Sequence, residues 1–186
     1  MGRSAHRFER RPPDPSDDES GGLRSQADPE SEARAAVLRR LTLAARTRAE
    51  LAEGLVERGF ENAVIDRVLD RFEEVGLIDD AAFAGSWVAS RHRTRGAARS
   101  VLRQELRNKG VDDELAEAAL ATITAEDELI RARALIDRKL MSLRCDDHDQ
   151  AVRRLVGYLR RRGYGGSIAF SVVTEALDLH DVQIDG

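Results

Sequence analysis

Apolar residues recur at every third or fourth position from about residue 31 to residue 178, a spacing that predicts amphipathic helices along this stretch. The clearest stripe is a pair of leucines four residues apart, followed after two residues by a basic residue and a glycine. It occurs three times: Leu51-x3-Leu55-x2-Arg58-Gly59, Leu102-x3-Leu106-x2-Lys109-Gly110 and Leu155-x3-Leu159-x2-Arg162-Gly163. The copies lie 51 and 53 residues apart. Nearly equal spacing indicates an internal repeat rather than a chance likeness of leucine-rich helices.

Two further apolar segments accompany each leucine pair, one before it and one after its glycine. The segments after the glycines align on Val64, Val68 and Leu69, on Leu115, Ala119 and Leu120, and on Ile168, Val172 and Val173. We therefore expect an all-α fold of three tandem three-helix repeats, each helix-turn-helix-like, in an elongated stack that can also curve. The expected boundaries are 31–79, 80–125 and 126–178.

Glycines mark the expected helix ends. Gly59, Gly110 and Gly163 suit the left-handed position that follows a helix, and the basic residue before each one suits the negative end of the helix dipole. Gly76 is expected to end a helix, and Asp79 to cap the next one. Phe83 and Trp87 follow one helical turn apart, so we expect both rings in a buried stripe.

Both ends of the chain depart from this pattern. All four prolines lie before residue 30, among arginine-rich and acidic pieces with little apolar surface, so residues 1–30 are expected to form a disordered tail. Residues 179–186 are expected to form an acidic C-terminal tail. Aromatic residues make up only 4% of the chain, so each repeat should have a small core of Leu, Val and Ala.

Several classes of protein are excluded by what the sequence lacks. One cysteine, Cys145, cannot form an internal disulfide, and four scattered histidines do not favour a zinc site. No apolar run approaches the ~20 residues that span a bilayer. No nucleophile–base pair or phosphate-binding loop supports an enzyme. We expect a non-enzymatic, soluble cytoplasmic protein that acts as a monomer.

Charge alternates along the chain although the net charge is only −4. Residues 81–110 carry seven basic and one acidic side chain, whereas residues 111–128 carry seven acidic and no basic ones. Residues 129–162 are basic again, with ten basic against four acidic side chains. The two basic blocks could be solvated helix surface, or they could meet an anionic partner. The candidate binding residues are Arg91, Arg93, Arg95, Arg99, Arg103, Arg107, Arg153, Arg154, Arg160 and Arg161.

The chain resembles the RecX family, bacterial regulators of the RecA recombinase. The resemblance covers about residues 32–178 and is strongest in three pieces, which read Gly76-Leu77-Ile78-Asp79-Asp80-x2-Phe83-Ala84-x2-Trp87-Val88-x2-Arg91, Arg95-Gly96, and Glu105-Leu106-x2-Lys109-Gly110-Val111. It implies three tandem three-helix repeats, as the apolar pattern does independently. It also implies binding to the RecA–single-stranded DNA filament, with lowered ATPase and strand exchange and no enzymatic activity.

Two alternatives remain at this point. The contacts could be made mainly to RecA or mainly to DNA phosphates. The helix-turn-helix-like units could also read a DNA sequence directly, although the third helices of repeats two and three contain no basic residue.

Overall fold

A computed structural model describes residues 28–143 and 147–184 of the chain, and these residues form nine helices and no strand. The helices are α1 (Pro29–Leu43), α2 (Arg48–Val56), α3 (Asn62–Glu74), α4 (Asp80–Arg95), α5 (Arg99–Asn108), α6 (Asp113–Leu120), α7 (Ala125–Leu140), α8 (His148–Arg160) and α9 (Gly166–Ile184). They fall into three consecutive groups of three, as the sequence predicts.

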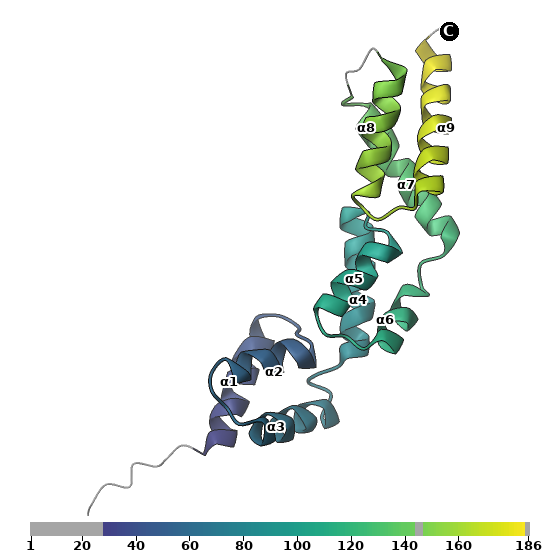
Figure 1. Cartoon of the computed structure of the whole chain (residues 1–186). Coiled ribbons are helices and arrows are strands. Elements are labelled where there is room, and N and C mark those ends of the chain that lie inside the picture. The colour runs from purple at the N-terminus through teal and green to yellow at the C-terminus, as the bar shows by residue number, and fades with distance from the viewer. Residues whose placement is uncertain (1–27, 144–146, 185–186) are drawn as a thin grey trace, which may run out of the picture.

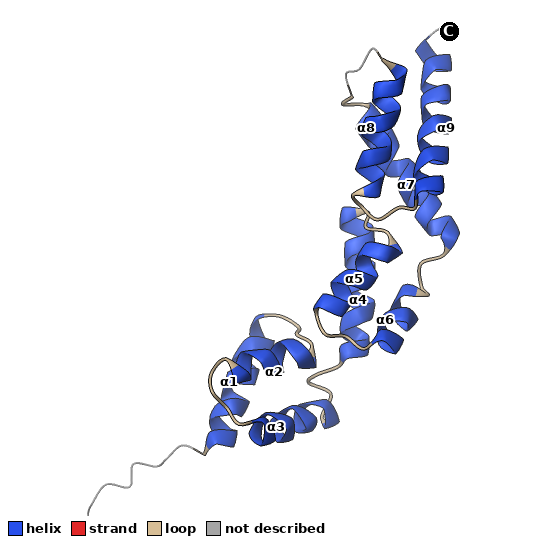
Figure 2. Cartoon of the chain, in the orientation of Figure 1, coloured by secondary structure: helices blue, strands red, loops and turns tan. Residues whose placement is uncertain are grey.

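The three groups follow one another along an elongated, curved body (Figure 1). Helices α1–α3 lie at one end and α7–α9 at the other, and Figure 2 shows only helices and connections between them. In the first group α3 packs on both α1 and α2, and in the third group α9 packs on both α7 and α8. We call the groups repeats 1, 2 and 3.

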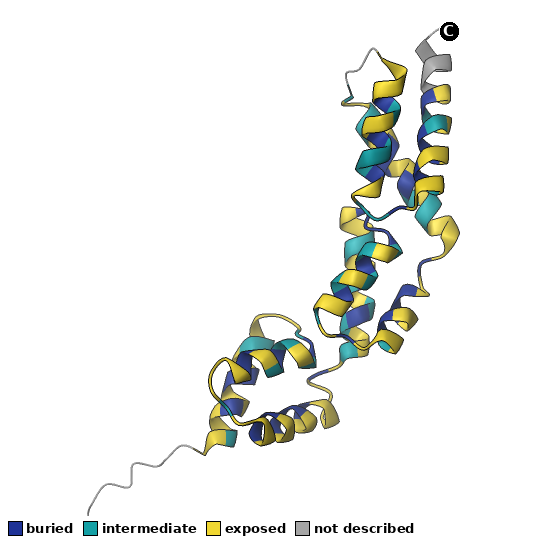
Figure 3. Ribbon diagram, viewed as in Figure 1, coloured by how far each residue is buried: buried dark blue, intermediate teal, exposed yellow. Residues whose placement is uncertain are grey.

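Each repeat buries its own small core, on the inner face of its helices (Figure 3). The six leucines of the repeated stripe are all at most 2% exposed. In the first helix of each repeat the buried residues include an alanine and a β-branched residue four positions later: Ala33 and Val37, Ala84 and Val88, Ala132 and Ile136. Alanine at this position lets neighbouring helices approach closely, which suits cores that contain few aromatic rings.

Phe83 and Trp87 do not form the centre of the second core, which corrects the expectation for them. Both rings are half-buried and pack against the edge of the core that contains Ala84 and Val88. They stack on each other with ring centroids 5.7 Å apart. The Trp87 indole donates a hydrogen bond to Glu105 at 2.8 Å, so its polar edge needs a position at the surface of the core.

The two ends of the helical body differ from the expected boundaries. Asp28 caps α1 and Pro29 occupies its first turn, so the first helix begins inside the segment expected as a tail. Residues 1–27 lie outside the described residues. At the other end α9 continues to Ile184, past the start of the expected acidic tail at residue 179.

The glycine turns form as predicted. Gly59, Gly110 and Gly163 all have positive φ, at 83°, 71° and 89°. In each case the residue after the glycine donates its backbone N–H to the carbonyl of the second leucine of the repeated pair. These bonds run from Phe60 to Leu55, from Val111 to Leu106 and from Tyr164 to Leu159. Gly76 also has positive φ, at 70°, and the Asp79 carboxylate caps α4 by accepting the Ala82 N–H at 2.8 Å.

Repeat 1 is joined to repeat 2, and repeat 2 to repeat 3, by contacts between equivalent positions, which we call the latch. In both, the start of one second helix meets the glycine turn that ends the next second helix. At the first junction the Thr47 hydroxyl donates to the Lys109 carbonyl at 2.6 Å, and the Arg48 N–H donates to the Asp80 carboxylate at 2.9 Å. Burial raises the pKa of Asp80, an effect that the Arg48 N–H partly opposes.

At the second junction the residues at the equivalent positions form the contacts between repeats. The Ala98 N–H donates to the Arg162 carbonyl at 2.9 Å, and the Arg99 N–H donates to the Glu128 carboxylate at 2.8 Å. A methyl group at Gly163 would overlap Ser100 and Val101, just as one at Gly110 would overlap Ala49. The glycines therefore serve both the turn and the close contact between repeats, and equivalent positions are in contact at the two junctions.

Candidate anion-binding trough

The arginines of α5 are not free, although the sequence suggested an unpaired patch there. Arg103 pairs with Glu117, and Arg107 pairs with Asp113 at 3.1 Å. Both acids lie on α6, which packs directly on α5. Hydrogen bonding to Glu117 raises the pKa of Arg103, and the same bond lowers the pKa of Glu117. The acidic block at residues 111–128 thus neutralises much of the basic block before it.

The candidate residues at the end of α4 and the start of α5 divide in a similar way. Arg91 lies 4.1 Å from the centroid of the Trp87 ring and 3.7 Å from the Glu105 carboxylate, so it is already engaged. Arg99 is half-buried at the second junction. Arg93 and Arg95 are exposed, and no carboxylate of the described residues pairs with either one.

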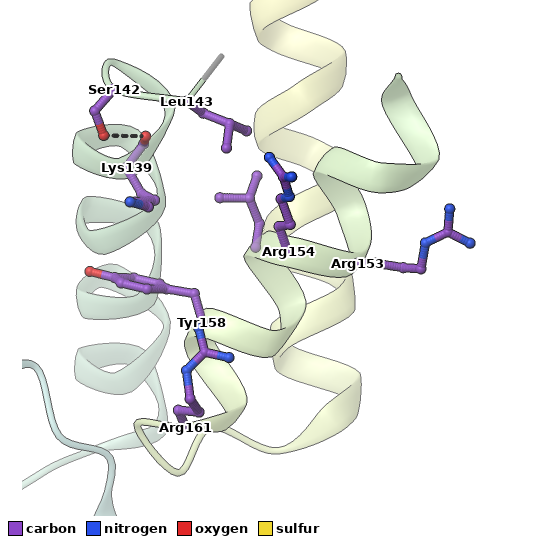
Figure 4. A pocket seen from close by; sticks show the side chains of 8 residues that line it. Lys139, Ser142, Leu143, Arg153, Arg154, Tyr158 and Arg161 are labelled. Atoms are coloured by element: carbon purple, nitrogen blue, oxygen red, sulfur yellow. Dashed lines mark hydrogen bonds between the residues drawn. The ribbon is translucent and has the colours of Figure 1, made fainter. Parts of the chain in front are cut away.

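The candidate arginines of repeat 3 have no ion-pair partner within the described part of the chain. Arg153, Arg154, Arg160 and Arg161 are all exposed and form no ion pair there. A hollow of about 590 Å³ lies between α7 and α8 beside three of them. Figure 4 shows the Tyr158 ring between Lys139 and Arg161, with Arg154 beside them and Arg153 reaching outward. The hollow is lined by Lys139, Ser142, Leu143, Arg153, Arg154, Leu155, Tyr158 and Arg161.

A second hollow, of about 480 Å³, adjoins the first at the junction of repeats 2 and 3. It shares Tyr158 and Arg161 with the first hollow and adds Arg95, Arg138 and Arg162. We call the two hollows together the basic trough. It is lined by seven basic side chains: Arg95, Arg138, Lys139, Arg153, Arg154, Arg161 and Arg162. The structure therefore brings Arg95 together with Arg153, Arg154 and Arg161, and leaves the other six candidates outside the trough.

Tyr158 is the aromatic residue of the trough, and the sequence analysis missed it. The Arg162 guanidinium lies 3.8 Å from the ring centroid and the Lys139 ammonium lies 6.0 Å from it. A cation over an aromatic face is attracted by the ring quadrupole, so these contacts order the basic side chains at the edge of the hollow. The result is an aromatic face set among cations.

Comparison of the three repeats shows how the groove between the first and second helices differs in repeat 3. The position of Tyr158 is occupied by Gly54 in repeat 1 and by Glu105 in repeat 2, and each faces a basic residue of the first helix. At Gly54 a methyl group would overlap the Arg40 guanidinium, so arginine fills the groove of repeat 1. In repeat 2 Glu105 neutralises Arg91. This three-way comparison of equivalent positions is the signal that could have found Tyr158 from the sequence.

Neither a metal site nor a membrane span is found among the described residues. No group of three or more His, Cys, Asp or Glu residues there is placed to hold a metal ion. None of the helices in this part of the chain is long and apolar enough to cross a bilayer. The basic trough offers anion binding through its arginines.

Comparison with known proteins decides the family. Models of the first, second and third three-helix domains of RecX match residues 33–72, 79–120 and 126–173, one on each repeat. The chain belongs to the RecX family. It is 45% identical over 165 residues to "Regulatory protein RecX" of Thermobifida fusca, which covers 89% of both chains. It is 48% identical over 151 residues to the Streptomyces coelicolor protein of that name, covering 81% of this chain and 80% of that one.

Solved RecX structures share the fold. The crystal structure of RecX from Lactobacillus salivarius superposes with a TM-score of 0.71 at 24% identity, covering 82% of this chain and 99% of that one. A second structure, described as regulatory protein RecX, gives a TM-score of 0.72 at 23% identity and covers 81% of this chain and 75% of that one. The three-repeat architecture therefore persists at low sequence identity.

Proposed function

We propose that this chain is an inhibitor of the RecA recombinase that binds the RecA–single-stranded DNA filament and lowers its ATPase and strand-exchange activity. The observation that carries the proposal is the match of all three repeats to RecX domains, together with relatives named as RecX regulators over most of the chain. We further propose that it acts as a monomer in the cytoplasm, without a cofactor and without chemistry of its own.

The shape and charge of the molecule support this role. An elongated, curved body presents a long surface to a filament (Figure 1). The basic trough provides unpaired cations on that body, and these can meet DNA phosphates or acidic RecA side chains. Self-repulsion among the cations opposes folding, so the trough is better explained by an anionic partner than by stability.

Direct reading of a DNA sequence is the weaker alternative. A helix that reads base edges needs Arg, Lys, Asn or Gln side chains facing the major groove. Helix α6 has no such residue, and in α3 Arg67 and Arg71 lie against Glu30 and Glu74, at 3.6 and 2.8 Å. The apolar faces of α3 and α6 instead pack into the cores of repeats 1 and 2.

The test of the proposal is RecA-dependent ATP hydrolysis on single-stranded DNA, measured while the chain is added at increasing concentration. We expect hydrolysis and strand exchange to fall together as the chain saturates the filament. Hydrolysis that stays constant at every concentration of the chain would show that it does not inhibit RecA. Binding of the chain to several DNA duplexes of unrelated sequence tests the alternative, because a protein that reads a DNA sequence binds one duplex more tightly than the others.

A further inference from the structure

The hollow at the second junction gathers arginines from both repeats that meet there. Arg95 comes from the end of α4 in repeat 2, Arg138 from α7, and Arg161 and Arg162 from the turn that follows α8. Within the described residues none of the four is paired with a carboxylate. The acid that lines the hollow, Glu105, already accepts the Trp87 indole N–H and lies beside Arg91.

At the first junction the basic residue at the equivalent position is neutralised within the fold, as is expected of a charge that serves stability alone. There the Lys109 ammonium is neutralised by the Glu50 carboxylate at 2.7 Å. Burial opposes ionisation of Glu50, but the Lys109 bond and the Thr47 N–H outweigh it, so the pKa of Glu50 is lowered. At the second junction the equivalent of Lys109 is Arg162, and the equivalent of Glu50 is Val101. The cation has been kept and its acid replaced by an apolar residue.

The Arg162 side chain is also incompletely satisfied. Its Nε atom is buried without a hydrogen-bond partner among the described residues, while its terminal nitrogen makes only a long bond of 3.4 Å to the Tyr158 carbonyl. Guanidinium groups form bidentate hydrogen bonds with phosphate oxygens. A guanidinium at the wall of a hollow whose N–H groups are not all hydrogen-bonded can donate to such a ligand. The neighbouring Tyr158 ring lies against Arg162 and lines both hollows, and its remaining apolar surface is of the kind on which unpaired bases stack.

We infer that the hollow at the second junction binds the phosphates of a single nucleic-acid strand, and that binding clamps repeats 2 and 3 together. The inference deepens the proposed function by naming the ligand of the trough. It rests on the proposed function only in taking the strand to be DNA. Arg95 on one repeat and Arg138 and Arg161 on the other would contact the same phosphates. The adjoining hollow shares Tyr158 and Arg161, so a strand can continue along α8 past Arg154. A single strand is favoured over a duplex because its bases are free to stack on Tyr158.

The test measures binding of the full chain to fluorescein-labelled oligodeoxythymidine by anisotropy, without RecA, over a range of salt concentrations. Arg138→Gln/Arg161→Gln is the main variant, since both side chains are exposed and thermal melts can confirm that it folds. We expect about tenfold weaker binding and a log–log salt slope that is smaller by about 1.4, the value for two lost phosphate contacts. Arg39→Gln is the matched control, because Arg39 is the exposed counterpart of Arg138 in repeat 1 and its loss should leave binding unchanged.

Two more measurements separate phosphate binding from its alternatives. Inorganic tripolyphosphate should raise the melting temperature of the wild-type chain, by clamping the junction, but not that of the double variant. Tyr158→Leu should weaken binding of the oligonucleotide and leave the tripolyphosphate effect intact, because only the bases stack. Polyglutamate should compete poorly with the oligonucleotide.

The inference is overturned if the double variant binds the oligonucleotide as tightly as the wild type, or if the wild type does not bind it at all. Competition by polyglutamate as strong, charge for charge, as that by the oligonucleotide would overturn it too and assign the hollow to an acidic protein surface. Each result leaves the proposed function standing if the chain still slows RecA-dependent ATP hydrolysis, so the two failures are distinguishable.

Discussion

The hydroxyl of Thr47 donates a hydrogen bond to the backbone carbonyl of Lys109, 62 residues further along the chain and 2.6 Å away. The same hydroxyl accepts the N–H of Glu50 and so caps α2, while the Glu50 carboxylate accepts the N–H of Thr47. Thr47 is fully buried. One side chain thus begins a helix in repeat 1 and holds the glycine turn of repeat 2 against it.

Thr47→Val should therefore cost more than loss of a helix cap. The variant removes the cap and also leaves the Lys109 carbonyl without its donor in a buried place, so we expect a loss of about 2–3 kcal/mol in the free energy of unfolding. Thr124→Val is the control, because Thr124 caps α7 through a similar capping box at an exposed site and should cost about 1 kcal/mol. Urea denaturation measures both, and equal losses would show that the Thr47–Lys109 bond contributes little.

The glycine turns offer a second matched pair. Gly59 and Gly110 both have positive φ, so alanine at either position should cost about 1–2 kcal/mol for the left-handed backbone. A methyl group at Gly59 meets nothing within 4 Å, whereas one at Gly110 overlaps the side chain of Ala49 across the junction. Gly110→Ala should exceed Gly59→Ala by about 1–3 kcal/mol in denaturation experiments, through overpacking. Similar costs for the two would argue against tight contact at the first junction.

Trp87 tests the corrected position of the aromatic pair. Because the ring is at the edge of its core, Trp87→Ala should cost about 2 kcal/mol, less than the ~3–5 kcal/mol of a fully buried aromatic ring. Trp87→Phe keeps most of the packing and loses the hydrogen bond to Glu105, so about 1 kcal/mol is expected. Thermal melts of the two variants measure these losses. A loss above 4 kcal/mol for the alanine variant would place Trp87 in the core after all.

Tyr164 predicts how the fold responds to alkaline pH. Burial, with a further contribution from Glu128, raises the pKa of Tyr164 to about 12 from an ordinary 10.0. Between these two values the unfolded chain gives up the phenol proton and the folded chain keeps it, so stability falls as pH rises, by at most about 2–3 kcal/mol. Tyr164→Phe should show a shallower decline of unfolding free energy over that range. A phenol absorbance titration in which Tyr164 ionises near pH 10 would contradict its buried position.

The repeats and most helix ends could be predicted from the sequence because they depend on local spacing. The leucine pairs, the positive-φ glycines and the capping boxes each act within a few residues of the chain. The pairing of charges could not be predicted in this way. Arg103 and Glu117 lie 14 residues apart on different helices, so whether they meet depends on how α5 packs on α6. A count of charges along the sequence therefore suggested a free patch where the structure has ion pairs.

Tyr158 and the latches between repeats were hidden for a related reason. Tyr158 gains its role from Arg162, Lys139 and the hollow beside it, which come from two helices and a turn. The carboxylates of Asp80 and Glu128 look like ordinary first-turn acids in the sequence, but each accepts an N–H from the preceding repeat. Contacts between repeats have no local signature, whereas equivalent positions compared across three copies do show where one copy departs from the others.

The measurement that tests the central claim most directly is inhibition of RecA-dependent ATP hydrolysis by two charge-reversal variants. Arg154→Glu/Arg161→Glu reverses exposed, unpaired cations of the basic trough. Arg103→Glu/Arg107→Glu reverses the same number of charges at positions already neutralised by α6. Thermal melts identify any loss of fold in either variant.

We predict that the trough variant inhibits hydrolysis only at much higher concentration than the wild type, with inhibition lost more steeply as salt rises. The α5 variant should inhibit nearly as well as the wild type wherever its melt shows it folded. Full inhibition by a folded trough variant would contradict the account, as the basic trough would then play no part in binding the filament.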